Sequence, residues 1–580
     1  MRRGANQGLS WIASFVVFGL LLMGIGVTGA YSQVDTGAIQ GTIKDQSGAV
    51  IPGATVTLTN EGTGLKLTTT SGGSGDYTFT PIRIGTYTVS AEYKGFQRVD
   101  QKHVTVQVQQ QVVVNITLPP GQVTQTVEVT GAPPALQTTN ASVGQVIGQR
   151  QVNNLPLNGR NYTFLAQLSA GVTQGQPETR GLNQTGDFSA NGTRPAQNNY
   201  LLDGMDDNAD LVDFLNGTAY VVRPPVDAIE EFKVQTSDFS AELGRAGGAV
   251  LNATLKSGTN QYHGGAWEFF RNSGLDAANF FENSNNQAKG EFRQNQFGAT
   301  IGGPLSIPHV YNGKDKTFFF ADYEGTRIRQ ATPFVNTVPT AIERTSGYMD
   351  FSELLTAQAT GTPQKDLLGR SFPLGSILDS ATTRPVTTGQ RDPVTGLVAT
   401  GTGYVRDAFP NNQIPAARVD PNAVKLLNLF PAPTNGNVFN NNTTDPVTND
   451  RIDQFDVRVD HNFSDKDQIF GAVSYSNEPT FKPGPFTGIT DGGAFNQGLQ
   501  TAATTTDVLS ETHSFSPTLI NEARLGYTRI GTSRVQPNDT NLKNIGLVSQ
   551  KCNWRLTTFS RNKLRTADLT RVLCGAPPVP

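Results

Sequence analysis

Residues 455–475 read FDVRVDHNFSDKDQIFGAVSY, and this stretch decides the fold class. From Phe455 to Phe463, apolar or aromatic side chains alternate with charged or polar ones, a period typical of a β-strand. Ser464–Asp467 is a tight polar turn, and alternation resumes from Ile469 to Tyr475. Apolar residues on one face and charges on the other predict antiparallel strands of a transmembrane β-barrel. A soluble sandwich gives a similar pattern but rarely directs this many charges inward.

Similar segments flank this hairpin, and residues 264–550 contain about seven or eight strand candidates. The residues that define three more strands are Phe297, Ala299 and Ile301, followed by a turn at Gly302–Pro304; Phe318–Tyr323; and Ala523, Leu525 and Tyr527, which alternate with Glu522, Arg524 and Thr528 after Ser516-Pro517. The stretch from about 330 to 450 is rich in Pro, Gly, Thr and Asn, so we expect large extracellular loops that capture ligand.

The composition of the 580-residue chain fits a mainly β protein of several domains. Gly (61) and Pro (33) are frequent and only 16% of residues are charged, which favours many turns and short strands over helical bundles. The net charge of −3 offers no basic field for phosphates, so we expect no nucleic-acid partner.

The first 32 residues have the features of a secretory signal peptide. Arg2 and Arg3 precede an apolar run from Ile12 to Val27, and the small-residue stretch Thr28–Ser32 follows. A membrane anchor is the alternative, but a run of 16 residues interrupted by glycines is short for a span of roughly 20. We expect cleavage after Ala30 or Ser32 and export from the cytoplasm.

Residues 36–118 predict a compact β-sandwich of short alternating strands. The strand candidates are Gly37–Ile43, Thr55–Thr59, Asp76–Phe79, Thr86–Ser90 and Val112–Leu118. Glycines that could supply turns with positive φ are Gly48, Gly53, Gly75, Gly85 and Gly95.

This segment resembles the carboxypeptidase regulatory-like domain. The resemblance rests on Gly48–Ala54 (GAVIPGA), Gly75–Phe79 (GDYTF), Gly85–Val89 (GTYTV) and Gly95-Phe96. It implies a seven-stranded sandwich, often grouped with carbohydrate-binding-like folds, that has no catalytic residues. A spacer or docking role fits this module better than sugar binding.

Residues 132–260 contain a series of motifs in a characteristic order. They are Asn154–Asn161 (NLPLNGRN), Phe188–Arg194 (FSANGTR), Asn198–Gly204 (NNYLLDG), Val226–Val234 (VDAIEEFKV), Ala241–Asn252 (AELGRAGGAVLN) and Thr254–Gly258 (TLKSG). Together they resemble the Oar-like subgroup of TonB-dependent outer-membrane receptors of Gram-negative bacteria. The resemblance implies a plug domain inside a barrel, with the motif residues Asp203, Gly204, Ile229, Glu230, Gly244, Arg245, Gly247 and Gly248.

Physical reasoning supports that assignment. Gly244, Gly247 and Gly248 allow backbones to approach closely where a sheet turns inside a lumen. Glu230, Glu231, Glu242 and Arg245 suit a wet interface between plug and wall, or are ordinary surface charges.

The segment just before these motifs, 119–131, predicts a linker with a short β-prone stretch. In the receptor family this position can hold the TonB box, to which the energy-coupling protein TonB adds a strand by backbone pairing. The candidate TonB contacts are Val123, Val127, Glu128, Val129 and Thr130. An ordinary linker strand is the alternative.

No catalytic, cofactor-binding or metal-binding motif is found in the sequence. The five histidines lack ligand spacing, and the two cysteines, Cys552 and Cys574, form no zinc motif. The acidic residues Asp203, Asp206, Asp207 and Asp210 do not follow EF-hand order, so a solvated loop is expected there. We therefore expect no enzyme and no cofactor.

The C-terminal part departs from the family pattern. A barrel of this family has 22 strands, and an open sheet edge in lipid would leave backbone groups unpaired. Residues 551–580 have six basic residues and one acidic residue, without barrel alternation. A frameshift or a truncated reading frame is our hypothesis for this segment, and a short paralogue is the alternative.

The predicted domains are a signal peptide (1–32), a carboxypeptidase regulatory-like sandwich (33–118), a linker with a candidate TonB box (119–131), a plug (132–260), a partial barrel with long loops (261–550) and a basic tail (551–580). The expected function is TonB-driven uptake of a large or scarce solute, with carbohydrate as one candidate, across the cell outer membrane. The expected partners are TonB and outer-membrane lipid. The alternative is a surface or periplasmic binding or adhesion protein.

Overall fold

The computed structural model describes residues 35–121, 126–130, 141–174, 187–209, 220–278, 280–284, 289–357, 362–486, 490–491, 497–516 and 519–535. The predicted signal peptide, Val123, Asp210 and the basic tail lie outside these ranges. Contacts divide the chain into two compact units. One comprises the chain up to Thr337 together with Phe439–Asn538, and the other comprises Val338–Val438.

The N-terminal part of the first unit is a sandwich of two sheets. Its strands are β1 (Thr36–Asp45), β2 (Thr55–Asn60), β3 (Lys66–Thr70), β4 (Asp76–Arg83), β5 (Gly85–Glu92), β6 (Arg98–Val106), β7 (Gln111–Val113), β8 (Ile116–Leu118) and β9 (Thr126–Thr130). One sheet has the order β4-β1-β7, with β8 also on β1, and the other is β3-β2-β5-β6-β9. Alternate side chains such as Ile39, Leu58 and Val89 are fully buried between the sheets.

The sandwich confirms most of the strands predicted from alternation. The short strands β7 and β8 follow each other along β1 and both pair with it, so they share one position in the sheet. The strands β1–β8 therefore occupy seven positions. All five predicted turn glycines have positive φ. The strands β3 and β6 escaped prediction, since β3 is mostly Lys and Thr and the first half of β6 is mostly charged or polar.

The region 143–255, here called the central domain, is built on a five-stranded mixed sheet of order β10-β15-β16-β13-β14. The strands of the domain are β10 (Val143–Gly148), β11 (Val172–Gln174), β12 (Phe188–Ala190), β13 (Asn199–Leu202), β14 (Met205–Asp206), β15 (Ile229–Ser237) and β16 (Val250–Leu255), of which β11 and β12 form a separate pair. Its helical segments are α2 (Gln149–Asn154), η1 (Asn158–Arg160), η2 (Tyr162–Leu168), η3 (Pro195–Gln197), η4 (Val226–Ala228) and η5 (Ala241–Leu243). Every residue of β16 is buried, so both faces of this sheet are covered.

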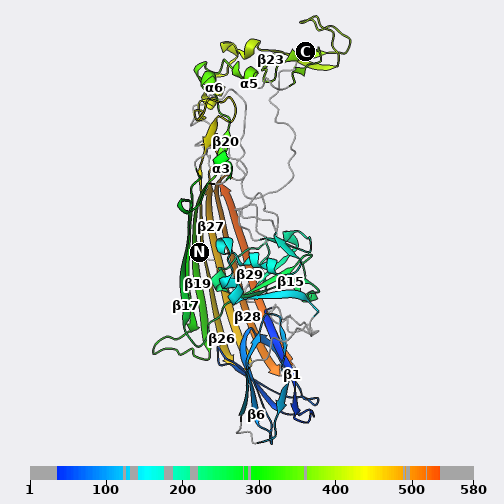
Figure 1. Cartoon of the computed structure of the whole chain (residues 1–580), viewed down its shortest axis with the longest axis vertical. Helices are drawn as coiled ribbons and strands as arrows, with labels where there is room; N and C mark the ends of the chain where they lie inside the picture. Colours follow the sequence, from blue (N-terminus) through cyan, green and yellow to red (C-terminus); the bar gives the residue numbers. More distant parts are fainter. Residues whose placement is uncertain are drawn as a thin grey trace, which may run out of the picture. The chain divides into compact units, whose positions relative to one another are not determined.

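A seven-stranded antiparallel sheet follows, in which each strand pairs with the next in sequence. Its strands are β17 (His263–Asn272), β18 (Phe292–Pro304), β19 (Thr317–Ala331), β26 (Val447–Ser464), β27 (Asp467–Lys482), β28 (Gly498–Ser516) and β29 (Leu519–Val535). Figure 1 shows these long strands side by side. We call this the barrel sheet. Short helices η6 (Ser273–Leu275) and α3 (Phe280–Ser284) connect β17 to β18.

The two faces of the barrel sheet differ in the burial of their side chains. On the inner face, Phe320, Phe470 and Val508 join the buried core of the central domain. On the outer face, apolar side chains are open, and Leu525 is 70% exposed. Arg458 and Asp456, predicted to point inward, are nearly fully buried. Apolar side chains are thus exposed on the outer face, and the predicted charges are buried on the inner face beside apolar residues that contact the central domain.

The turn predicted at Gly302–Pro304 is wrong, because these residues continue β18 and pair with Phe318–Phe320 of β19. Gly303 is needed there for space: a Cβ on it would lie 2.5 Å from Cδ1 of Tyr262. The turn at Ser464–Asp467 is confirmed, since β26 ends and β27 begins there.

The second unit, Val338–Val438, is part of the connection between β19 and β26, which is flanked by the paired strands β20 (Phe334–Asn336) and β25 (Asn442–Thr444). Its elements are α4 (Ala341–Thr345), α5 (Glu353–Ala357), β21 (Gln364–Lys365), β22 (Ser371–Phe372), β23 (Leu378–Val386), β24 (Gly403–Ala408), η7 (Pro410–Asn412), η8 (Ala416–Arg418) and α6 (Pro421–Leu427). Within the stretch expected to form large loops, Leu368, Val386 and Val405 form a small core of their own.

Candidate functional site

A buried arginine on the inner face of β26 marks the candidate site. Arg458 is 5% exposed. One of its terminal nitrogens donates to Asp203 Oδ1 at 3.0 Å and to Leu255 O at 3.3 Å, and its Nε lies 3.2 Å from Asp460 Oδ2. Its guanidinium also lies 4.3 Å from the ring centroid of Phe470. The side chain therefore joins the barrel sheet to the central domain by charge as well as by packing.

Asp203 is the central domain's half of this contact. It lies in the turn between β13 and β14, where Asp203 and Gly204 both have positive φ. The turn is fixed because Asp203 N donates to Ala253 O and Leu255 N donates to Asp203 Oδ1. Burial raises the pKa of Asp203 to about 6, and the charge of Arg458 opposes that rise.

The sandwich reaches the same place through two charged side chains. Arg83, at the end of β4, forms an ion pair with Asp460. Asp35 accepts from Arg524 of β29 at 2.5 Å, while another nitrogen of Arg524 donates to Asp203 O at 2.9 Å.

We call these six residues the junction network: Asp35, Arg83, Asp203, Arg458, Asp460 and Arg524. A cavity of about 70 Å³ lies beside it and is lined by residues of the sandwich and the barrel sheet, among them Phe470 and Glu522. Sandwich, central domain and barrel sheet are thus joined by ion pairs withdrawn from water. Removing one partner from such pairs is costly.

A second contact joins the sandwich to the central domain. The backbone N–H of Val108 donates to Glu231 on β15, and Lys233 Nζ lies 3.4 Å from Gln109 O. Burial raises the pKa of Glu231 to about 7 and lowers that of Lys233 to about 8. Both groups therefore titrate closer to neutral pH than they do in water.

The candidate TonB segment forms the edge strand β9, which pairs in parallel with β6. Val127 lies opposite Val99, and Glu128 forms an ion pair with Lys102 at 2.7 Å. Val127 and Glu128 are exposed. The backbones of Val129 and Thr130 belong to the strand, their side chains are outside the description, and Val123 is outside it altogether. The predicted linker therefore ends as a strand of the sandwich.

The predicted plug motif residues divide into two groups. Asp203, Gly204 and Ile229 lie in or beside the core, and Ile229 is fully buried. Glu230 is half-buried, and burial raises its pKa.

The other group surrounds the Gly-rich turn. Gly247 and Gly248 both donate from their backbone N–H to Gln197 O. A Cβ on Gly248 would come within 2.4 Å of Asn198 Oδ1, whereas Gly244 has open space. Arg245 forms an exposed ion pair with Asp206 at 3.2 Å. The close contact between the Gly-rich turn and Asn198 therefore requires glycine at position 248, whereas position 244 has room for a side chain.

The expectation of a solvated acidic loop is wrong for Asp203 and Asp207. Asp207 is 4% exposed, and its Oδ1 accepts from Val222 N at 3.0 Å and from Thr506 Oγ1 of β28 at 3.2 Å. Burial raises its pKa. Hydrogen-bond donors from the central domain and the barrel sheet allow this burial, and they come from segments distant in sequence.

Of the junction network, the sequence identified Asp203 as a motif residue and Arg458, Asp460 and Arg524 as inward-facing residues. It had no signal for Asp35 and Arg83, which lie at the ends of ordinary sandwich strands. Elsewhere, Asp467, Glu511 and His513 place potential metal-ligand atoms within 4.8 Å of one another, with each side chain partly open to solvent. Among the described residues, no helix has the length and hydropathy needed to cross a membrane.

Two protein families match this chain. Residues 254–570 match the family described as "Outer membrane beta barrel domain", and residues 38–119 match "Carboxypeptidase regulatory-like domain". A curated relative, "TonB-dependent transporter Oar" of Myxococcus xanthus, is 26% identical over 313 residues, which cover 51% of this chain and 27% of the relative. The chain therefore spans about a quarter of the length of that relative.

Solved structures of outer-membrane proteins are also similar. A mutant of the ferric enterobactin receptor PfeA of Pseudomonas aeruginosa is 10% identical, with a TM-score of 0.37 and coverage of 68% of this chain and 42% of that chain. The outer membrane transporter YddB of Escherichia coli is 12% identical, with a TM-score of 0.37 and coverage of 67% and 39%.

Proposed function

The chain belongs to the outer membrane beta barrel domain family, and on that premise we propose that it acts in TonB-dependent uptake of a large or scarce solute. The central domain acts as the plug of the lumen. The observation that supports this role is its packing on the inner face of the barrel sheet, through a shared core and the ion pair between Asp203 and Arg458. The name of the Myxococcus relative, a TonB-dependent transporter, agrees with it.

TonB binds at β9. This strand is the last in the order β3-β2-β5-β6-β9, so one of its edges has no neighbour among the described strands. Such an edge presents backbone N–H and C=O groups to which an extended partner segment can add as a further strand. The exposed side chains of Val127 and Glu128 leave the approach open.

Force applied at β9 reaches the plug through the sandwich. Since β9 pairs with β6, a pull on β9 passes into the sandwich. The other sheet of the sandwich contacts the barrel sheet through Arg83 and Asp35, and the loop after β6 contacts the plug through Val108. Loss of these contacts deprives Asp460 and Arg524 of their sandwich partners and so weakens the network around Asp203.

The test compares two double variants for binding of a purified C-terminal domain of TonB to the detergent-solubilised full chain. Successive N–H groups of a strand point to opposite edges, so Val127→Pro with Glu128→Pro removes one donor from each edge. We expect binding to weaken by about tenfold or more. The matched pair Val127→Thr with Glu128→Gln keeps every N–H and should bind as the parent does. Equal binding by both pairs would refute the contact and favour a surface-binding role without TonB.

A further inference from the structure

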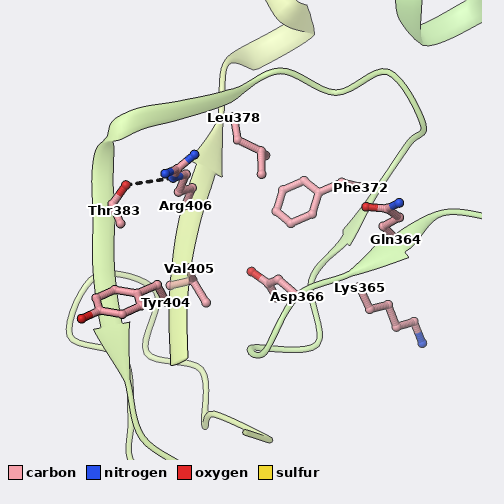
Figure 2. A pocket seen from close by; sticks show the side chains of 9 residues that line it. All are labelled: Gln364, Lys365, Asp366, Phe372, Leu378, Thr383, Tyr404, Val405 and Arg406. Atoms are coloured by element: carbon pink, nitrogen blue, oxygen red, sulfur yellow. Dashed lines mark hydrogen bonds between the residues drawn. The ribbon is translucent and has the colours of Figure 1, made fainter. Parts of the chain in front are cut away.

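The second unit contains a pocket of about 630 Å³ between two β-hairpins. One hairpin is β21–β22 and the other is β23–β24, and Figure 2 shows Phe372, Asp366, Leu378 and Val405 around a common space, whereas the amine of Lys365 points away from it. The residues that line it are Gln364, Lys365, Asp366, Phe372, Leu378, Thr383, Tyr404, Val405 and Arg406. This volume lies in the range of small-molecule sites, roughly 300–1,000 Å³.

One side of the pocket is apolar and firmly placed. Phe372 and Leu378 face the space, with the buried Val405 opposite. The guanidinium of Arg370, in the turn of the same hairpin, lies 5.3 Å from the ring centroid of Phe372. A flat apolar group can therefore enter without displacing the wall.

The carboxylate in the wall is already neutralised. Asp366 accepts from Arg370 Nε at 2.8 Å and from the backbone N–H groups of Leu368 and Arg370. Behind it, Asp407 pairs with both Arg370 and Arg384, and Arg384 also pairs with Asp392. These acids have cationic partners of their own, so they do not need the two cations that line the pocket.

Those two cations are Lys365 and Arg406. Arg406 donates through Nε to Thr383 Oγ1 at 2.9 Å, the dashed contact in Figure 2. Within the described part of the chain, its terminal nitrogens and Lys365 Nζ have no acceptor. An oriented guanidinium with two open N–H₂ groups matches the two oxygens of a carboxylate.

We propose that this pocket binds small organic anions in which a carboxylate is attached to a flat apolar group, the apolar part against Phe372 and Leu378 and the carboxylate on Arg406. That such anions are the transported solute rests on the proposed uptake function. The binding itself does not.

The experiment measures binding of 2-naphthoate and of its neutral isostere 2-naphthamide to the detergent-solubilised full chain by ligand-observed NMR. The charge variant is Arg406→Gln. The Arg406 side chain is exposed, so we expect the fold to tolerate the substitution. The matched control is Arg391→Gln, an exposed arginine of the same unit that donates to Gly396 O and does not line the pocket.

We expect the parent and the Arg391→Gln chain to bind naphthoate equally and the charge variant to bind it about tenfold more weakly. Naphthamide should bind the parent as weakly as naphthoate binds the charge variant. Equal naphthoate binding by parent and charge variant, or equal binding of amide and carboxylate, would overturn the proposal. Equal TonB binding by the proline pair and its matched control pair, with naphthoate binding intact, would refute the proposed uptake function alone.

Discussion

At the scale of single residues, the junction network concentrates charge where water is excluded. Arg458 serves two carboxylates, Asp203 from the central domain and Asp460 from its own strand. Arg83 of the sandwich shares Asp460, and its guanidinium lies 5.3 Å from the ring centroid of Phe470. Removing a buried cation that has two anionic partners strongly destabilises the fold, because both carboxylates are left buried without a counter-charge.

Replacement of Arg458 by Met should therefore destabilise the chain by about 3–5 kcal/mol. Asp203 would lose the cation that opposes the rise of its pKa above about 6. Its protonation should then rescue part of the loss, so the variant should gain stability as the pH falls from 8 to 6. Denaturant unfolding of the full chain in detergent measures both effects.

The control for this substitution is Arg451→Gln on the same strand, whose ion pair with Asp453 is largely exposed. It should cost less than about 1 kcal/mol. If Arg458→Met and Arg451→Gln lower the free energy of unfolding by the same amount, the junction network contributes no more to stability than an exposed ion pair does.

At the scale of elements, the loop between β6 and β7 and the strand β15 form a contact that depends on pH. Glu231 is 7% exposed and accepts the Val108 N–H. Because burial raises its pKa to about 7, the folded chain binds a proton between pH 4.5 and 7 that the unfolded chain has released. The contribution of this group to stability is therefore full below pH 4.5 and is lost as the pH rises to 7.

Glu231→Gln should remove that pH dependence and leave segment 107–110 equally protected at pH 5 and pH 8. In the parent chain, protection of this segment should fall between these values by the equivalent of about 1–3 kcal/mol. Hydrogen–deuterium exchange, corrected for the intrinsic effect of pH, measures it. A parent chain without any such loss would show that Glu231 ionises as it does in water.

At the scale of the whole molecule, the main feature of the barrel sheet is that its two edge strands each leave one edge without a pairing strand among the described residues. Within the described residues, β17 and β29 lie at the two ends of the strand order and do not pair with each other. Lipid does not satisfy unpaired backbone groups, so a lumen needs further strands to close it. Binding at β9 and at the pocket of the second unit does not depend on closure, and both can be tested without it.

We expect the 580-residue chain by itself to migrate identically in boiled and unboiled gel samples of outer membranes, because the seven strands that the structure describes leave two free edges and so form no detergent-resistant barrel. A closed barrel protein from the same membranes is the control and should shift on boiling. A shift of this chain would mean that a second copy, or residues outside the described ranges, supplies the missing pairing.

Sequence alone determined the features that depend on near neighbours along the chain. Alternation placed Val457 outward and Arg458 inward, and the turn glycines of the sandwich have the positive φ that was expected, because period and turn geometry are local properties. The resemblance of residues 33–118 to the carboxypeptidase regulatory-like domain and the outer-membrane barrel character of the later strands were also evident from sequence. The families matched by residues 38–119 and 254–570 confirm both.

Only the tertiary structure decided which charges meet. Asp35 and Asp203 are separated from Arg524 and Arg458 by hundreds of residues, and nothing local marks them as partners. The same holds for Glu231, whose burial depends on an N–H from the sandwich, and for β9, whose partner β6 is chosen by the fold. The reason is physical: the free energy of a buried charge or of a strand edge depends on what packs against it, which folding alone brings into place.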